Sequence, residues 1–170
     1  MKNSKNFKRA LFIGRFQPFH NGHLHAVKKL LKNYNEVILV IGSAESECSF
    51  ENPFTAGERI EMIRSCFSKN ELARLILIPI RDINDHSKWV SHVVGYVPEF
   101  QHLYSNNELV RRLFYEAGFD VHALWFFRKE LHTGMIIRAK IAERKKWQDS
   151  VPKTVAEIIK RLEAEKRLRK

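Results

Sequence analysis

Short apolar runs alternate with amphipathic helical patterns along almost the whole chain, and this alternation constrains the fold more than any other feature. Five runs have the apolar character and the flanking turn residues of buried strands. They span residues 10–14, 36–42, 74–80, 102–105 and 120–127. Helical patterns occupy residues 23–33, 58–67, 87–97, 108–119, 133–146 and 151–170. Strand–helix alternation of this kind favours a parallel sheet covered by helices.

We therefore predict an α/β fold, with a single Rossmann-like, doubly wound parallel sheet of about five strands, helices on both faces and a C-terminal helix. The 170 residues suit one core, so we expect residues 1–170 to form a single domain with a C-terminal helical tail at about 152–170. Ser87 is a candidate cap for its helix, Gly118 closes the next one, and Pro152 stands near the start of the last.

The net charge of +11 leaves two classes of partner open, nucleic acids and small phosphorylated ligands. Much of this charge lies in 142-AERKKWQ-148 and in residues 160–170, a pattern typical of solvated helix faces. No apolar run approaches a transmembrane length, and Cys48 and Cys66 form no CxxC pair. We therefore expect a cytoplasmic protein that binds neither membrane nor nucleic acid.

The stretch 14-GRFQPFHNGHLHAV-27 joins the first predicted strand to the first predicted helix. Gly14 ends the strand, and a glycine there lets the backbone approach a ligand closely. His20, Gly22 and His23 stand where the helix begins, and a helix N-terminus offers N–H groups and partial positive charge that suit phosphate. Each histidine alone would be read as a surface residue at a tight turn, but the combination predicts a phosphate site.

These residues resemble a known family. The motif 20-HNGH-23 is similar to the HxGH motif of the nucleotidyltransferase superfamily. The longer segments 14-GRFQPFHNGHL-24 and 51-ENPFTAGERIEMI-63, with Thr133, Gly134, Ile137 and Arg138, resemble archaeal-type nicotinamide-nucleotide adenylyltransferases, and the likeness runs from about Leu11 to Pro152. The resemblance implies attack of the nicotinamide mononucleotide phosphate on the α-phosphate of ATP, with NAD and pyrophosphate as products. Such a reaction needs positioning and charge stabilisation rather than an enzyme nucleophile.

The resemblance also implies roles for individual residues. It makes His20, His23 and Arg15 the catalytic residues. It places ATP against Gly14, Arg15, Phe16, His20, Gly22, His23, Ser105, Thr133, Gly134 and Arg138. It places nicotinamide mononucleotide against Trp89, Asp82, Asn52, Phe54 and Arg59. Mg²⁺ is expected to be held mainly by the ATP phosphates, with no protein metal site, and we expect a homo-oligomer.

The chain departs from the family pattern at three places. Met135 replaces a hydroxyl residue, 105-SNNE-108 places Asn106 and Glu108 where the family has SGNP, and Phe127 replaces the asparagine of FNR. At Thr55 and Glu58 a capping box explains the pattern without a ligand, although Arg59 just beyond it could reach a substrate phosphate.

Two alternatives stay open. One is a sibling enzyme with another phosphorylated acceptor, such as a phosphopantetheine, flavin mononucleotide or a polyol phosphate. The other is a non-catalytic nucleotide- or RNA-binding module, which would explain the charge but not the paired histidines.

Overall fold

The computed structural model describes residues 7–45, 49–124 and 133–169, and its strands form one all-parallel sheet. The five strands lie in the order β3-β2-β1-β4-β5. Their bounds are Arg9–Gly14 (β1), Glu36–Ile41 (β2), Leu75–Pro79 (β3), His102–Tyr104 (β4) and Val121–His122 (β5). The predicted α/β fold class is confirmed. The strand order reverses between β1 and β4, and ligands in such sheets bind beyond the carboxyl ends of the strands at this point.

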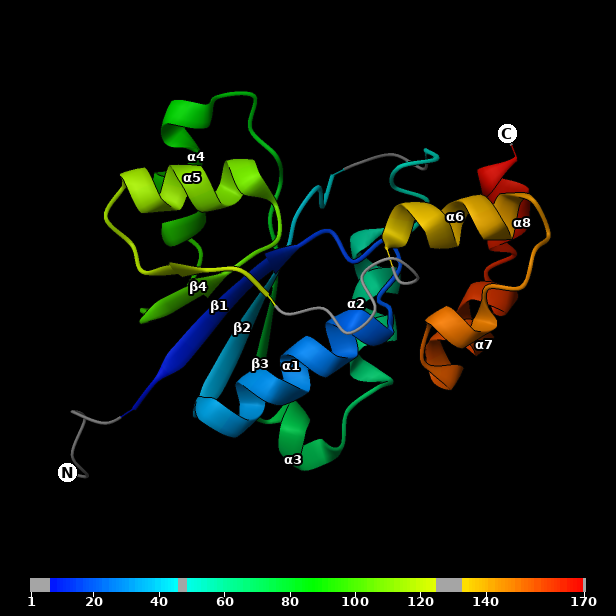
Figure 1. The fold of residues 1–170 in the computed structure, drawn as a ribbon, viewed down its shortest axis with the longest axis horizontal. Helices are drawn as coiled ribbons and strands as arrows, with labels where there is room; N and C mark the ends of the chain where they lie inside the picture. The colour runs from blue at the N-terminus through cyan, green and yellow to red at the C-terminus, as the bar shows by residue number, and fades with distance from the viewer. Residues whose placement is uncertain (1–6, 46–48, 125–132, 170) are drawn as a thin grey trace.

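Helices cover both faces of the sheet, as Figure 1 shows. Helices α4 and α5 lie on one side, whereas α1 and α3 lie on the other, and α6, α7 and α8 gather on the side toward which the strand arrows point. The bounds are Asn21–Asn33 (α1), Ala56–Arg64 (α2), Lys69–Leu72 (α3), His86–Val94 (α4), Glu108–Glu116 (α5), Gly134–Ala142 (α6), Lys153–Arg161 (α7) and Ala164–Leu168 (α8), with a 3-10 turn at Gln148–Ser150.

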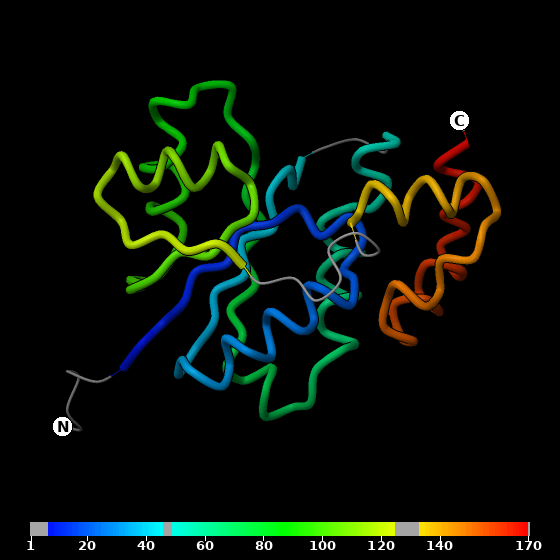
Figure 2. The backbone as a smooth tube through the Cα atoms, viewed as in Figure 1, coloured from blue at the N-terminus to red at the C-terminus, as the bar shows by residue number. Residues whose placement is uncertain are grey.

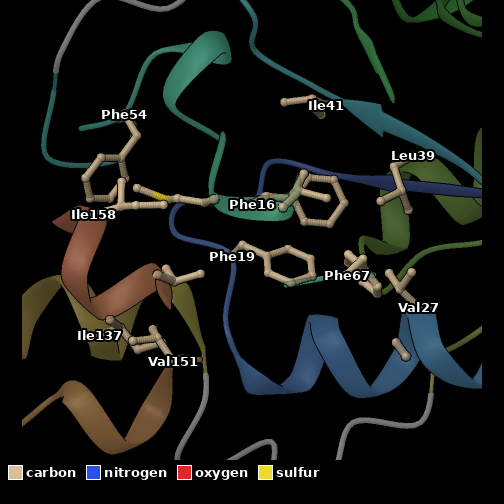
Figure 3. Packing of buried hydrophobic residues seen from close by; sticks show 14 of the residues in the cluster. Phe16, Phe19, Val27, Leu39, Ile41, Phe54, Phe67, Ile137, Val151 and Ile158 are labelled. Carbon is tan, nitrogen blue, oxygen red and sulfur yellow. The ribbon is translucent and has the colours of Figure 1, made fainter. Parts of the chain in front are cut away.

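Two core clusters follow the alternation of side chains along the strands. On β1, Ala10 and Phe12 belong to the larger cluster, whereas Leu11 and Ile13 belong to the smaller one. The larger cluster also takes residues from α1, α2 and α6 to α8, and Figure 3 shows Phe16 and Phe19 within it. The smaller cluster packs α4 and α5 on the opposite face.

Several predicted helix ends are confirmed. Thr55 and Glu58 form the predicted capping box of α2. Gly118 has a φ of 85° beyond α5, where its N–H donates to the Tyr115 carbonyl and the N–H of Phe119 to that of Phe114. These two hydrogen bonds satisfy carbonyl groups of the last helical turn. The positive φ at this position favours glycine.

Other predicted boundaries were wrong. Asp85, not Ser87, caps α4, since its side chain accepts from the Ser87 N–H and Ser87 lies inside the helix. The C-terminal segment is two helices, because Glu163 adopts a left-handed conformation with φ 49° and separates α7 from α8. The short helix α3 was not predicted, since a single turn shows no apolar periodicity.

The basic C-terminal segment is tied into the molecule. Figure 2 shows its backbone, in orange and red, folded back against α6. Arg167 donates to both carboxylate oxygens of Glu58, at 2.8 and 2.9 Å, and Arg161 pairs with Glu61. Part of the charge expected on a solvated face is therefore paired within the chain. Among the described helices, none is long and apolar enough to cross a membrane.

Candidate active site

A cavity of about 570 Å³ opens at the carboxyl ends of the strands, where the order of the sheet reverses. A second cavity of about 290 Å³ adjoins it. Five residues line both cavities, namely Arg15, His20, His23, Thr133 and Gly134. The first predicted strand-to-helix turn and the start of α6, more than a hundred residues apart in sequence, thus meet at one place.

The two histidines of the HxGH motif form a reciprocal cap at the start of α1. The Nδ1 atom of His20 accepts from the N–H of His23 at 3.3 Å, and the Nδ1 atom of His23 accepts from the N–H of His20 at 3.3 Å. Serine or threonine with glutamate usually makes this arrangement. A neutral imidazole whose Nδ1 accepts carries its proton on Nε2, so the cap sets the tautomer of both rings. Each ring then presents an Nε2–H donor.

Packing holds the His23 ring in place. It stacks on His20 with ring centroids 3.5 Å apart, and it contacts Phe16 and Phe19 at 4.9 and 5.6 Å. Burial, and secondarily the neighbouring His20, lower the pKa of His23 well below its ordinary value. His23 is therefore neutral near pH 7, and it donates a hydrogen bond without carrying a charge.

The start of α6 also lines both cavities. Thr133 caps this helix, since its Oγ1 accepts from the N–H of Ile136 at 3.3 Å. A Cβ added at Gly134 would lie 2.8 Å from the Gln17 carbonyl oxygen and 2.9 Å from an Arg138 nitrogen. Only glycine fits this close approach, which brings the N-terminal N–H groups of α6 beside the histidines.

Arg138 is a buried cation beside the smaller cavity. Its side chain is 4% exposed, and one guanidinium nitrogen donates to the Gln17 carbonyl at 2.7 Å. Within the described residues its Nε has no hydrogen-bond partner and its guanidinium makes no ion pair. Burial, followed by the nearby Arg15, lowers its pKa. A buried cation with an unused donor is the group that a phosphate oxygen would complement.

Trp89 and Asp82 line the larger cavity but not the smaller one. Trp89, on α4, is 9% exposed and packs in the smaller core cluster while it lines the cavity. Asp82 accepts from the Ser43 hydroxyl at 2.5 Å and from the Ser43 N–H at 3.3 Å, so its carboxylate has a fixed orientation. The structure thus brings an aromatic face and a carboxylate into the same cavity as the histidines.

Three residues predicted to touch the mononucleotide do not line either cavity. Phe54 is buried in the larger core cluster, where its backbone N–H and C=O bond the Gln17 amide at 3.1 and 2.8 Å. Asn52 lies in the preceding loop. Arg59 is fully buried and donates to four backbone carbonyls, those of Thr55, Arg15, Gly42 and Ser43, at 2.7–3.2 Å. Arg59 and Phe54 thus bond backbone groups outside both cavities, and their contact with the mononucleotide stays a prediction.

The remaining predicted residues are placed as follows. Gly14 and Ser105 line the larger cavity, Phe16 lines the smaller one, and Gly22 is buried in the first turn of α1. The cavity also contains residues that the sequence analysis did not name as ligands, namely Phe12, Ile13, Gly42, Ser43, Asn106, Asn107 and Val110. The two asparagines directly follow a predicted strand, and this position could have identified them as cavity residues. The apolar residues have no such feature in the sequence.

Comparison with known proteins agrees with this geometry. The family described as cytidylyltransferase-like matches residues 11–150. A nicotinamide-nucleotide adenylyltransferase of Archaeoglobus fulgidus is 49% identical over 95% of this chain and 95% of its own length. The enzyme of that name from Thermoplasma acidophilum is 43% identical over 98% of this chain and 93% of its own. The chain belongs to the nicotinamide-nucleotide adenylyltransferase family.

A solved structure shares the fold of this adenylyltransferase. It is a bifunctional NMN adenylyltransferase/ADP ribose pyrophosphatase from Francisella tularensis, complexed with AMP and a manganese ion. The TM-score is 0.74 at 23% identity, and the match covers 95% of this chain and 52% of that one. The predictions for Cys48 and Phe127, and the last part of the strand predicted over residues 120–127, fall outside the described residues.

Proposed function

We propose that the protein transfers the adenylyl group of ATP to nicotinamide mononucleotide and releases NAD and pyrophosphate. One observation carries this proposal. The histidine cap and the start of α6 line both cavities and Arg138 lines the smaller one, whereas Trp89 and Asp82 line only the larger one. The first set suits phosphate oxygens, and the second suits a flat cationic ring that carries an amide.

The reaction needs no nucleophile from the protein. A phosphate oxygen of the mononucleotide attacks the α-phosphorus of ATP, and the bond from that phosphorus to the bridging oxygen of the β-phosphate breaks. The Nε2–H groups of His20 and His23 donate to non-bridging oxygens of the transferring phosphate, where negative charge builds up. Arg15 adds positive charge at the same place, since it lines both cavities.

The distal phosphates of ATP bind at the smaller cavity. The first-turn N–H groups of α6 point toward them, and Arg138 supplies a buried positive charge. Met135 is 64% exposed at this cavity and offers no hydroxyl, so backbone groups and Arg138 carry the contact. The leaving pyrophosphate is stabilised by the same groups.

The nicotinamide ring binds against Trp89. The ring stacks on the indole, and the Asp82 carboxylate accepts from the carboxamide NH₂ group. The indole is held by the smaller core cluster, and the carboxylate is held by Ser43. Both groups are therefore oriented before the substrate arrives, which lowers the entropic cost of binding.

Mg²⁺ enters as part of the substrate, bound to ATP. Among the described residues that line the two cavities, Asp82 is the only carboxylate, and Ser43 already donates to both of its oxygens. This donor set fits an ion held by phosphate oxygens and water rather than by a protein cage. When bound, the ion neutralises part of the triphosphate charge.

The test is a synthesis assay on the purified protein. ATP, Mg²⁺ and nicotinamide mononucleotide should yield NAD, measured with a coupled dehydrogenase. Parallel reactions with phosphopantetheine, flavin mononucleotide and a polyol phosphate test the sibling activities. Turnover of one of these, with none of the mononucleotide, would overturn the proposed acceptor. A matched variant, His25→Ala, removes an exposed histidine from the same helix and should leave the rate unchanged.

The proposal also concerns the cellular location and the oligomeric state of the enzyme. We expect it to act in the cytoplasm, as its cysteine usage predicts, and as a homo-oligomer. Tight, salt-sensitive RNA binding without NAD synthesis would instead favour the binding-module alternative.

A further inference from the structure

A second group of polar side chains lies on the sheet, outside the cavities described above. His102 is the first residue of β4, His122 is the last residue of β5, and Asp120 immediately precedes β5. The register pairs Leu103 with Val121 and Tyr104 with His122, so His102 lies opposite Asp120. Because side chains alternate along parallel strands, all three project from one face, the face that also carries α1.

The three side chains converge. Nε2 of His102 lies 3.3 Å from one carboxylate oxygen of Asp120, and Nε2 of His122 lies 3.1 Å from the other. The candidate ligand atoms all lie within 4.8 Å of one another. Two ligand atoms on a tetrahedral zinc ion, at bond lengths of about 2.1 Å, are about 3.4 Å apart. The two imidazole–carboxylate separations are already close to this value, whereas the ligand atoms that lie farthest apart, within 4.8 Å, have to approach one another further.

Tyr34 and Tyr104 contact the two imidazoles. The Tyr34 hydroxyl lies 2.8 Å from Nδ1 of His102 and 2.9 Å from the Tyr104 hydroxyl. The Tyr34 hydroxyl can accept from Nδ1–H of His102, and in that tautomer the Nε2 lone pair of His102 is available to a metal ion. Metal-binding histidines are generally oriented in this way.

The second imidazole is also fixed. The Tyr104 ring stacks on His122 with centroids 5.1 Å apart and an interplanar angle of 24°. The side chains of His102, Asp120 and His122 are 30, 58 and 40% exposed, so an ion and a coordinated water can reach the group.

We propose that His102, Asp120 and His122 form a binding site for a divalent transition-metal ion, with zinc the best fit. Two imidazole nitrogens and one carboxylate oxygen favour zinc over Mg²⁺ or Ca²⁺, which prefer oxygen ligands. Water completes a four-coordinate shell. The ion would clamp the edge strand β5 to β4 and so stabilise the strand that leads to Leu124. The N–H of Leu124 donates to the Asn106 side chain at 2.9 Å, and Asn106 lines the substrate cavity.

The test is a zinc titration of the untagged, chelator-treated full chain by calorimetry. The wild type should bind one more equivalent of Zn²⁺ than the double variant His102→Ala/His122→Ala. Asp120→Asn, which keeps the size of the side chain, should weaken binding without unfolding the edge strand. Tyr34→Phe should weaken it by about 10–100-fold, the usual effect of losing an outer-shell partner. The control His86→Ala removes an exposed histidine of α4 and should not change binding.

A further readout does not depend on activity. Zn²⁺ should raise the Tm of the wild type but not that of the double variant. Equal binding by the wild type and the double variant would overturn the proposal, as would no binding by either. The three side chains would then form only ion pairs.

Discussion

The reciprocal histidine cap predicts that His23 has two separable roles, one in stability and one in turnover. His23→Ala removes the acceptor for the His20 N–H and the ring that packs on Phe16 and Phe19. The hydrogen bond is long at 3.3 Å, so the cap contributes at the low end of its usual range. With the lost packing, we expect the free energy of unfolding to fall by about 1–2 kcal/mol.

The effect on turnover should be much larger than this. Loss of the Nε2–H donor removes stabilisation of charge that is present only in the transition state, so kcat should fall by about 10²–10³-fold. The KM values for both substrates should change far less. Measurement combines urea unfolding with initial rates of NAD synthesis.

His23→Gln separates the two roles. Glutamine at the third helical position can accept from the N–H of His20, so it restores most of the cap. Its amide does not reproduce the ring Nε2–H, so kcat should stay low. Recovery of turnover together with stability would refute this reasoning, since His23 would then act only through the helix. Wild-type turnover in His23→Ala would refute it as well.

Three further predictions concern the site. Arg138→Ala should weaken ATP binding by about 1.5–3 kcal/mol, measured through the KM for ATP, and leave binding of the mononucleotide unchanged. Met135→Thr should tighten ATP binding or leave it unchanged. The opposite ranking of the two variants would mean that the ATP phosphates bind elsewhere. Trp89→Ala should weaken the mononucleotide by about 1–3 kcal/mol in binding titrations with little effect on ATP, and equal loss for both ligands would indicate a packing role. Because the pKa of His23 is lowered in the folded state, its contribution to stability is full above about pH 6.5 and is lost as the pH falls below it, by at most about 1.4 kcal/mol per pH unit. Urea unfolding of His23→Gln should show a shallower loss over this range, and an identical slope would contradict the shift.

The fold could be predicted because its determinants are local in sequence. Each of the five strands coincides with one of the predicted apolar runs, and each amphipathic helix shows its own period. The break between α7 and α8 could not be predicted in this way. Glu163 is neither glycine nor asparagine, so nothing in the local sequence marks its left-handed backbone. The extent of the single domain stays a prediction.

Much of the candidate site could be predicted for a topological reason. The carboxyl ends of parallel strands meet at one edge of the sheet. The residues that follow Gly14 and Tyr104 therefore come together independently of how the helices pack. The histidine cap was not foreseen, because capping boxes are expected from serine, threonine and glutamate. The pattern predicted that both histidines stand where the helix begins, but not that each caps the other.

Arg59 shows why residue type alone does not separate a ligand from a positioning residue. A guanidinium donates equally well to phosphate oxygens and to backbone carbonyls, and both occur at the carboxyl edge of a parallel sheet. Here the carbonyls of Arg15, Gly42 and Ser43 converge on it. These oxygens are partial negative charges at an edge where anionic substrates must bind. Burial lowers the pKa of Arg59 to about 10, so it remains charged near pH 7 and compensates them. The single nitrogen of a lysine could not reach these carbonyls together, so an arginine suits this position better than a lysine.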